Sequence, residues 1–222
     1  MKTITVTFIR HGQTLFNTMN KLQGWADSPL TENGIITAKH TGDILAQHHF
    51  DAYYSSDLKR ASDTATYIAR RNSFYQAQPI QNPDFREVFF GSFEGSDNDI
   101  TWGQAGAPHG YTSQNDIIAH TSFETARQYL NDLDPRHLAE LGSTFYQRQE
   151  RSLKSLLATN HDHDELLVVT HGTFIKSLAL KYAPEIDALT NYPANGSMTT
   201  VIISEDDDAH LQVKIAKYNQ LE

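Results

Sequence analysis

Two arginines and two histidines form the set of side chains best suited to chemistry in this sequence. Arg10 and His11 are adjacent. Arg60 follows a Ser-Ser-Asp segment, and His171 directly precedes a glycine. Neutral imidazole is a competent nucleophile near pH 7, because its unperturbed pKa is about 6.5. Arginine offers a planar fork of N–H donors that suits phosphoryl oxygens. Together these side chains predict a site for a dianionic phosphoryl group.

The hydrophobic pattern places each of these motifs at the end of an expected strand. Residues 3–9 alternate Ile, Val and Phe with threonine, and 51–55 form a short buried segment. The run 166–170 is continuously apolar, as in strands buried on both faces of a parallel sheet. Two later segments, 198–204 and 211–218, predict strands joined by an acidic turn.

Helical periodicity fills the intervals between these strands. The alternation favours an α/β fold, a three-layer α/β/α sandwich whose mostly parallel sheet has an antiparallel edge. Ligands of such sheets bind beyond the carboxyl ends of the strands, so the motifs should meet on one rim. Helix N-termini add N–H donors there, and Gly12 and Gly172 let the backbone approach a ligand. The expected helices begin at Thr31, at Ser56 or Asp57, at Ser143 and after Gly172.

Length and composition bound the domain organisation. The chain has 222 residues, which at roughly 150 residues per domain suggests one domain with a sizeable insertion. Residues 97–142 are rich in polar residues and glycine, with weak or short helical signals. We expect a single domain spanning 1–222 in which 97–142 is an inserted segment that covers the substrate; a plain surface excursion is the alternative.

The absence of cysteine and the net charge exclude several classes of function. Without cysteine there is no thiol nucleophile, disulfide framework or thiolate metal site. The formal net charge of −9 disfavours binding to nucleic acid or an anionic membrane, so an anion site must be a local positive pocket. No apolar run is long enough for a membrane helix or a signal peptide, which favours a cytoplasmic protein. Cleavage of an N-terminal segment of typical length would also remove Arg10 and His11.

The surplus of histidines raises the question of a metal site. The segment His161–Asp164 alternates histidine and aspartate, but a solvated turn before a strand is the simpler interpretation. The aspartates at 206–208 are most simply a hairpin turn, although their oxygens could hold calcium weakly. The other histidines show no ligand spacing, and we expect no metal and no cofactor. They lie at positions 40, 48, 49, 109, 120, 137 and 210.

Five blocks of the sequence resemble the signature of the histidine phosphatase superfamily, the phosphoglycerate mutase-like proteins. They stand in the family's order from residue 4 to about 180, which is far more specific than a lone Arg-His-Gly triplet. The resemblance implies the phosphoglycerate mutase-like α/β fold. The blocks are Arg10–Thr14 with Asn17; Gln23–Trp25 with Asp27, Pro29, Leu30 and Gly34; Ser55–Ala61 with Thr64 and Ala65; Arg86 and Glu87 with Phe90, Gly91, Glu94 and Gly95; and Val168–Gly172.

The resemblance implies a role for each residue of the phosphoryl site. His11 would attack phosphorus and carry a phosphohistidine, while its other ring nitrogen donates to a backbone carbonyl. Arg10 and Arg60 would clamp the phosphoryl oxygens. His171, charged next to the phosphate, would stabilise the equatorial oxygens during transfer, and Gly172 would lie against the same group.

Glu87 matches the proton donor of the family. It would protonate the leaving oxygen and then activate water, which requires a raised carboxyl pKa. Glu94 lies close by in the sequence, but the spacing to the following Phe-Gly pair favours Glu87. Asn17 would donate a hydrogen bond to a phosphate oxygen, and Gln23 and Gly24 would line the entrance of the site.

We expect hydrolysis of a small phosphorylated metabolite rather than mutase chemistry. A mutase of this family needs additional cations for a substrate carboxylate, and no lysine occurs between residues 60 and 153. Thr173 departs from the second glycine found in many members, which leaves the substrate open. A phosphoglycerate mutase, a non-catalytic module that binds phosphorylated ligands and a histidine-based metal protein are the alternatives. The oligomeric state is not predicted.

Overall fold

A computed structural model of the chain describes residues 2–75, 77–206, 208 and 210–222. It contains one mixed sheet built from β1 Thr3–Arg10, β2 Ala52–Ser55, β3 Ile80–Gln81, β4 Glu165–Thr170, β5 Met198–Glu205 and β6 Leu211–Gln220. The strand order is β3-β2-β4-β1-β5-β6. The first four pair in parallel, whereas β5 and β6 pair antiparallel at one edge. This topology confirms the predicted α/β fold with an antiparallel edge.

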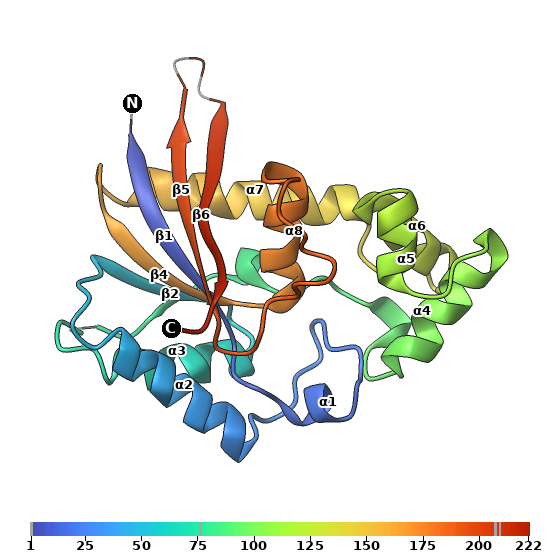
Figure 1. Ribbon diagram of the computed structural model, residues 1–222, viewed down its shortest axis with the longest axis horizontal. Coiled ribbons are helices and arrows are strands. Elements are labelled where there is room, and N and C mark those ends of the chain that lie inside the picture. The colour runs from blue at the N-terminus through green and yellow to red at the C-terminus, as the bar shows by residue number, and fades with distance from the viewer. Residues whose placement is uncertain (1, 76, 207, 209) are drawn as a thin grey trace.

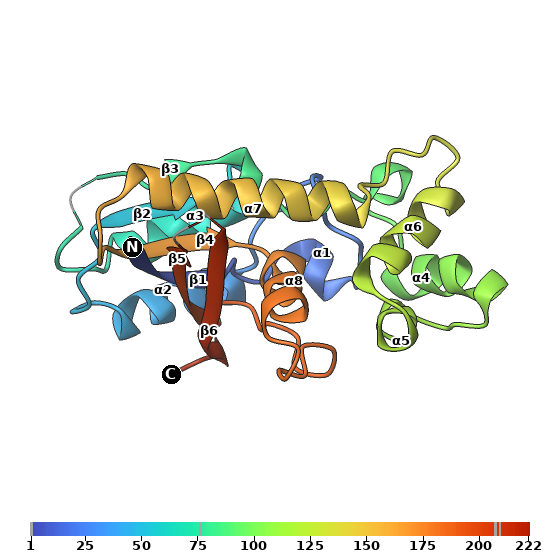
Figure 2. The same cartoon turned by 90° about the horizontal axis from the view of Figure 1, so that it is seen from above.

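Helices cover both faces of the sheet, as Figures 1 and 2 show. One layer consists of α2 Glu32–Ile44 and α3 Lys59–Ala69, and the other of α7 Gly142–Thr159 and α8 Gly172–Tyr182. Alternate residues of β1 explain the two layers: Ile4, Val6 and Phe8 belong to the core beneath α7 and α8. Ile9 belongs to the core on the side of α2 and α3. The sheet is therefore buried on both faces, which produces the three predicted layers.

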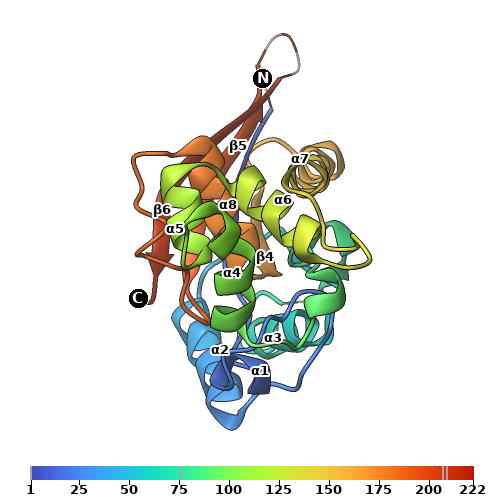
Figure 3. The same cartoon turned by 90° about the vertical axis from the view of Figure 1, so that its right-hand side faces the viewer.

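A group of short helices stands at one end of the molecule and faces the viewer in Figure 3. It consists of α4 Asn98–Gly106, α5 Gln114–His120 and α6 Phe123–Leu133. Each begins with a side-chain oxygen that accepts a backbone N–H of the first turn, from Asp97, Ser113 and Ser122 respectively. The helical pattern of 97–142 is weak in the sequence, and these N-cap residues mark where its helices begin. The remaining helical segments are α1 Leu15–Thr18 and the 3₁₀ turns Pro83–Phe85, Gly91–Phe93 and Ala107–His109.

Thr31 caps α2 as predicted, because its side chain accepts the N–H of Gly34. The prediction that Ser56 or Asp57 caps α3 is wrong. The N-cap of α3 is Leu58, which offers no side-chain hydrogen bond. Asp57 instead pairs with a distant arginine. The acidic turn 206–208 includes residue 207, which lies outside the described residues. Among the helices described, none combines the length and the apolar character of a membrane span.

Candidate active site

The sheet brings the chemical motifs together because β2, β4 and β1 are parallel neighbours. Arg10 is paired with Thr170, so His11 and His171 both leave the sheet at the same edge. The N–H of His11 donates to the carbonyl of Thr170 at 3.0 Å, and the two imidazole centroids lie 5.2 Å apart. Arg60 reaches the same place from the first turn of α3. The four side chains thus meet on one rim, as the topology requires.

The hydrogen bonds of His11 define its nucleophilic nitrogen. Nδ1 lies 2.7 Å from the carbonyl oxygen of Gly12, and it must carry a proton to donate there. Nε2 then holds the lone pair, and it accepts a hydrogen bond from Nε of Arg60 at 3.2 Å. Burial, followed by the charges of Arg60 and Arg10, lowers the pKa of His11 well below its ordinary value of 6.5. The imidazole is therefore neutral at pH 7, and the lone pair of its Nε2 faces the N–H of Arg60.

Arg60 is buried and its N–H donors are directed at protein acceptors. Besides Nε on His11, Nη1 donates to the carbonyl of Ala26 and to Asp27. Nη2 donates to the carbonyls of Gln23 and Gly24, at 3.4 and 2.7 Å. The expected clamp on phosphoryl oxygens is thus limited mainly to Nε.

Arg10 and His171 supply buried polar atoms without partners. Nη1 of Arg10 donates to the carbonyl of Pro193 at 2.7 Å and the guanidinium lies over the ring of Tyr192. Nε of Arg10 and both ring nitrogens of His171 make no hydrogen bond within the described residues. Such atoms are costly to bury. The oxygens of a phosphoryl group beside His11 could accept from Nε of Arg10 and from a protonated ring nitrogen of His171.

The charge expected on His171 differs from the state that its surroundings favour. Burial, with the charge of Arg60 and the proximity of His11, lowers its pKa well below 6.5. The protein groups alone therefore hold His171 neutral. A dianionic phosphoryl group would oppose this shift, since an adjacent negative charge favours imidazolium.

Glu87 lines the pocket, and its carboxyl group is buried there. Its two carboxyl oxygens accept the N–H groups of Val88 and Thr173, both at 2.9 Å. Burial raises its pKa, although these hydrogen bonds and the charges of Arg60 and Arg10 oppose the shift. The predicted direction of the pKa shift is confirmed.

Glu94, the rival of Glu87, has a different environment. Its oxygens accept four backbone N–H groups, from Gly24, Trp25, Ala26 and Phe90. These bonds fix the loop whose carbonyls hold Arg60. Glu94 is absent from the pocket lining, whereas Glu87 is part of it. The geometry therefore favours Glu87 as the acid and assigns Glu94 to holding the loop.

Arg148 holds the segment that carries Glu87, and the sequence did not reveal this role. From α7 it donates to the carbonyls of Asp84, Arg86 and Glu87. It also pairs with Glu140 at 2.9 Å, and both side chains are nearly buried. The sequence does place a charged residue, Arg148, on the inner face of a predicted helix, and such a residue needs buried polar partners.

Asn17 and Gln23 line the pocket, but Gly24 does not. Oδ1 of Asn17 accepts the N–H of Thr14 in a capping box, which leaves its amide group for a ligand. The Gln23 side chain accepts from the Thr14 hydroxyl and donates to Ser28, so it braces the loop. Gly24, expected at the entrance, instead accepts Nη2 of Arg60 with its carbonyl and donates its N–H to Glu94. Arg60 and His171, both buried beside His11, are likewise not among the lining residues.

Gly12, Gly172 and the N-terminus of α8, expected to contact a ligand, mainly contact other protein groups. A Cβ on Gly12 would lie 2.4 Å from the carbonyl oxygen of Gly34, and one on Gly172 would lie 2.3 Å from the Tyr192 hydroxyl. Gly172 does line the pocket. At the start of α8, the N–H of Thr173 is taken by Glu87. The close approach that requires these glycines is therefore to neighbouring protein groups.

The pocket above His11 has a volume of about 640 Å³ and is lined mainly by polar residues. Helices α4 and α5 contribute to its wall through side chains such as Trp102 and Asn115. Two lysines also line it, Lys21 and Lys176. Both lysines lie outside residues 60–153, the range whose lack of lysine favours hydrolysis over mutase chemistry. Further lining residues that the sequence reasoning missed are Tyr192 and Asn195, on the loop before β5.

The alternative of a metal site gains no support from the described residues. Among them, no group of three or more acidic or histidine side chains is arranged to hold a metal ion. His161 and His163 are exposed and lie 3.5 and 3.4 Å from Asp164 and Asp162. These contacts fit the interpretation of a solvated turn.

Comparison with known proteins establishes the family. The family model of the histidine phosphatase superfamily (branch 1) matches residues 6–215, so the chain belongs to this superfamily. A metal-independent phosphoserine phosphatase from Arabidopsis thaliana is 30% identical over 179 residues, 79% of this chain and 67% of the relative. A 2,3-bisphosphoglycerate-dependent phosphoglycerate mutase from Methanococcus vannielii is 32% identical over 93 residues, 42% of this chain and 40% of the relative.

A solved structure extends the likeness over the whole fold. The phosphoglycerate mutase from Bacillus anthracis str. Sterne superposes with a TM-score of 0.88 at 28% identity, covering 99% of this chain and 94% of that one. The superfamily and these relatives define the chain as a phosphatase or a mutase.

Proposed function

We propose that this protein is a phosphatase that hydrolyses a small phosphate monoester through a phosphohistidine on His11. The observation that carries the proposal is the pair of contacts that the His11 ring nitrogens make with the Gly12 carbonyl and with Arg60. Nδ1 is committed to the carbonyl of Gly12, which leaves a neutral Nε2 beside Arg60 at the pocket. A buried carboxyl with a raised pKa, Glu87, stands in the same pocket.

The reaction proceeds in two transfers. Nε2 of His11 bonds to phosphorus as the P–O bond to the leaving group breaks, and protonated Glu87 delivers its proton to the departing oxygen. Glu87, now a carboxylate, takes a proton from water, whose oxygen attacks phosphorus and breaks the P–N bond. Inorganic phosphate leaves, and His11 and the Glu87 acid are restored. Arg10, Arg60 and His171 stabilise the equatorial oxygens.

A phosphoglycerate mutase is the second candidate, and the superposition on the Bacillus anthracis protein favours it. In a mutase, the phosphohistidine would return its phosphoryl group to a bound acceptor instead of water. The likeness to the Arabidopsis phosphatase supports hydrolysis, as does the absence of paired arginines in the 97–142 segment. We further propose a single domain in which this segment covers the substrate, and a cytoplasmic location.

Phosphate release from a panel of monoesters in the presence of EDTA tests the proposal. We expect turnover to be unchanged by the chelator, because the transfer uses only side chains of the chain. The panel should include p-nitrophenyl phosphate and both monophosphoglycerates. Loss of activity in EDTA would contradict the metal-free mechanism, and interconversion of the phosphoglycerates faster than hydrolysis would favour the mutase. Binding of phosphorylated ligands with no turnover would identify a non-catalytic module.

A further inference from the structure

Asn219 has a backbone conformation that is unusual for a residue in a strand. It lies on β6 with a φ of 53°, in the left-handed region that residues other than glycine seldom adopt. The register of β5 against β6 shifts between Met198 and Thr200, where β6 carries one extra residue. Such β-bulges redirect a side chain and are frequent next to active sites. Here the Asn219 side chain is directed at the loop that precedes β5, as its hydrogen bonds show.

The Asn219 side chain uses both ends of its amide group to hold the loop 191–196, between α8 and β5. Its Oδ1 accepts the N–H of Ala194 at 2.8 Å. Its Nδ2 donates to the carbonyl of Tyr192 at 3.2 Å and to Oδ1 of Asn191. Figure 1 shows this loop running beside the end of β6 that leads to the C-terminus. One side chain on the edge strand therefore fixes three residues of the loop.

The same loop orients the guanidinium group of Arg10. Among the described residues, the carbonyl of Pro193 is the hydrogen-bond acceptor of this group, at 2.7 Å from Nη1. The guanidinium also lies 5.1 Å from the centroid of the Tyr192 ring. Pro193 stands between the two residues whose backbone groups Asn219 binds, Tyr192 and Ala194. The position of its carbonyl, and with it that of Arg10, therefore depends on the Asn219 side chain.

The loop also contacts His11, whereas Asn219 does not reach the pocket. Nδ2 of Asn195 donates to the carbonyl of His11 at 2.8 Å, and Asn195 and Tyr192 both line the pocket. Asn219 is absent from the lining. Any effect of its side chain on phosphoryl transfer must therefore pass through the loop.

We propose that Asn219 is a positioning residue for phosphoryl transfer, which holds the loop 191–196 so that Arg10 presents its free Nε to the phosphoryl group at His11. The inference rests on the proposed function, because it concerns the same site, and it applies to transfer to water or to a second acceptor alike. Without the Asn219 side chain, the loop and the guanidinium can shift. Displacement of a catalytic group by about 1 Å can cost about a hundredfold in rate.

Asn219→Gly tests the proposal with little disturbance of the backbone. Glycine tolerates the positive φ, and its N–H can still donate to the Thr199 hydroxyl, as that of Asn219 does at 3.1 Å. We expect kcat/KM for p-nitrophenyl phosphate to fall by about tenfold to a hundredfold. The dissociation constant of orthovanadate, which mimics the five-coordinate phosphorus of the transfer, should rise by a similar factor.

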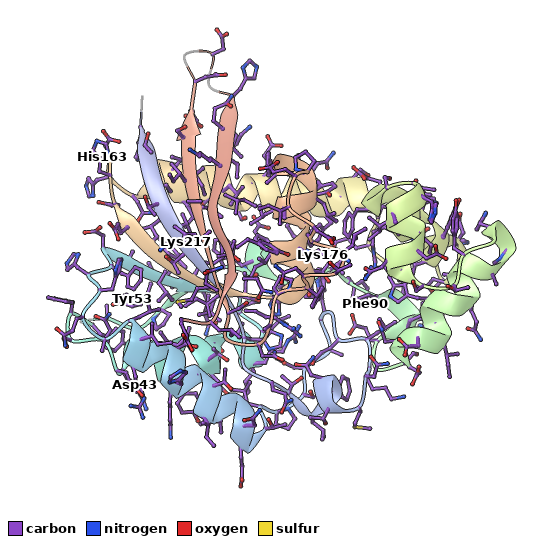
Figure 4. The ribbon with its side chains drawn as sticks, in the orientation of Figure 1. Asp43, Tyr53, Phe90, His163, Lys176 and Lys217 are labelled. Atoms are coloured by element: carbon purple, nitrogen blue, oxygen red, sulfur yellow. The ribbon has the colours of Figure 1, made fainter. Side chains whose placement is uncertain are left out.

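His163→Gly is the matched control for the loss of a side chain at positive φ. His163 has a φ of 66° and lies in the exposed turn before β4. Figure 4 shows it well away from Lys176 and Phe90, which line the pocket. This variant should keep kcat/KM and vanadate binding within about twofold of the wild type.

Coupling to Arg10 separates positioning from a general structural defect. In an Arg10→Met background the guanidinium is absent, so Asn219→Gly should change the dissociation constant of vanadate less than about twofold. An equal loss in both backgrounds would overturn the proposal, as would wild-type vanadate binding by Asn219→Gly.

A second variant keeps the test decisive if Asn219→Gly does not fold. Asn219→Asp retains the acceptor for the N–H of Ala194 but places a carboxylate oxygen against the carbonyl of Tyr192. It should lose part of the vanadate affinity, again with Arg10 present only, and an unchanged affinity would contradict the proposal. Failure of the wild type to hydrolyse any ester would overturn the proposed function instead, and vanadate binding would still measure the effect of Asn219 on the site.

Discussion

Replacement of His11 by alanine is expected to lower kcat for monoester hydrolysis on the order of 10⁴-fold or more. Among the described residues, His11 is the histidine that lines the pocket, and its Nε2 lies 3.2 Å from Nε of Arg60. Loss of the nucleophile removes the covalent route entirely, and the remaining arginines can only bind the phosphate. Phosphate release under single-turnover conditions measures the effect.

His40→Ala is the matched control for this prediction. His40 is exposed on α2, away from the pocket, so its replacement should change kcat less than twofold or so. Binding of inorganic phosphate to His11→Ala, followed by calorimetry, shows whether the pocket is intact. A folded His11→Ala variant that retains more than about a tenth of wild-type turnover would remove His11 from the mechanism.

Replacement of Glu87 by glutamine is expected to have the second-largest effect, about 10²-fold to 10⁴-fold on the hydrolysis of alkyl phosphates. The alcohol of an alkyl phosphate leaves poorly unless its oxygen is protonated, and glutamine has no acidic proton to donate. p-Nitrophenolate needs no proton, so Glu87→Gln should still release one equivalent of it in a burst. Steady-state turnover should then be slow, because water also lacks its base. Absence of a burst, or equal losses with both kinds of ester, would contradict the assignment.

The raised pKa of Glu87 sets the sign of the pH dependence. Its acid form is required for the first transfer, so kcat/KM for alkyl esters should fall as the pH rises through that pKa. Because burial shifts the pKa upward, the acid form persists to higher pH than for an ordinary glutamate. Glu87→Gln should lack this descending limb. A limb that persists in the variant would assign it to another group.

The sequence permits prediction of the fold and of the rim where the motifs meet. Each motif follows an apolar strand, and the β2-β4-β1 order then brings Arg60, His171 and His11 together. Local patterns were also sufficient for the N-cap at Thr31. These features depend on the periodicity of apolar residues and on the rule that parallel strands end at one edge of a sheet. Both can be applied to the sequence alone.

Other parts of the site depend on contacts between distant segments and were not predicted. Gly24 was expected at the entrance, but its carbonyl holds a guanidinium 36 residues away. In the sequence, Lys176 belongs to an amphipathic helix, a pattern that does not predict its burial. The burial results from packing against Asn115 and Tyr192. The charge expected on His171 next to a phosphate stays a prediction, because the protein groups alone favour the neutral ring through burial.

The phosphoenzyme itself gives the most direct test of the mechanism. The protein is mixed with p-nitrophenyl phosphate, quenched rapidly in alkali, digested and analysed by mass spectrometry. We predict one phosphoryl group on the peptide that contains His11. It should be stable in alkali, be lost in acid and accumulate in Glu87→Gln. Turnover without a phosphorylated His11 peptide, or with the phosphoryl group on another residue, would contradict it.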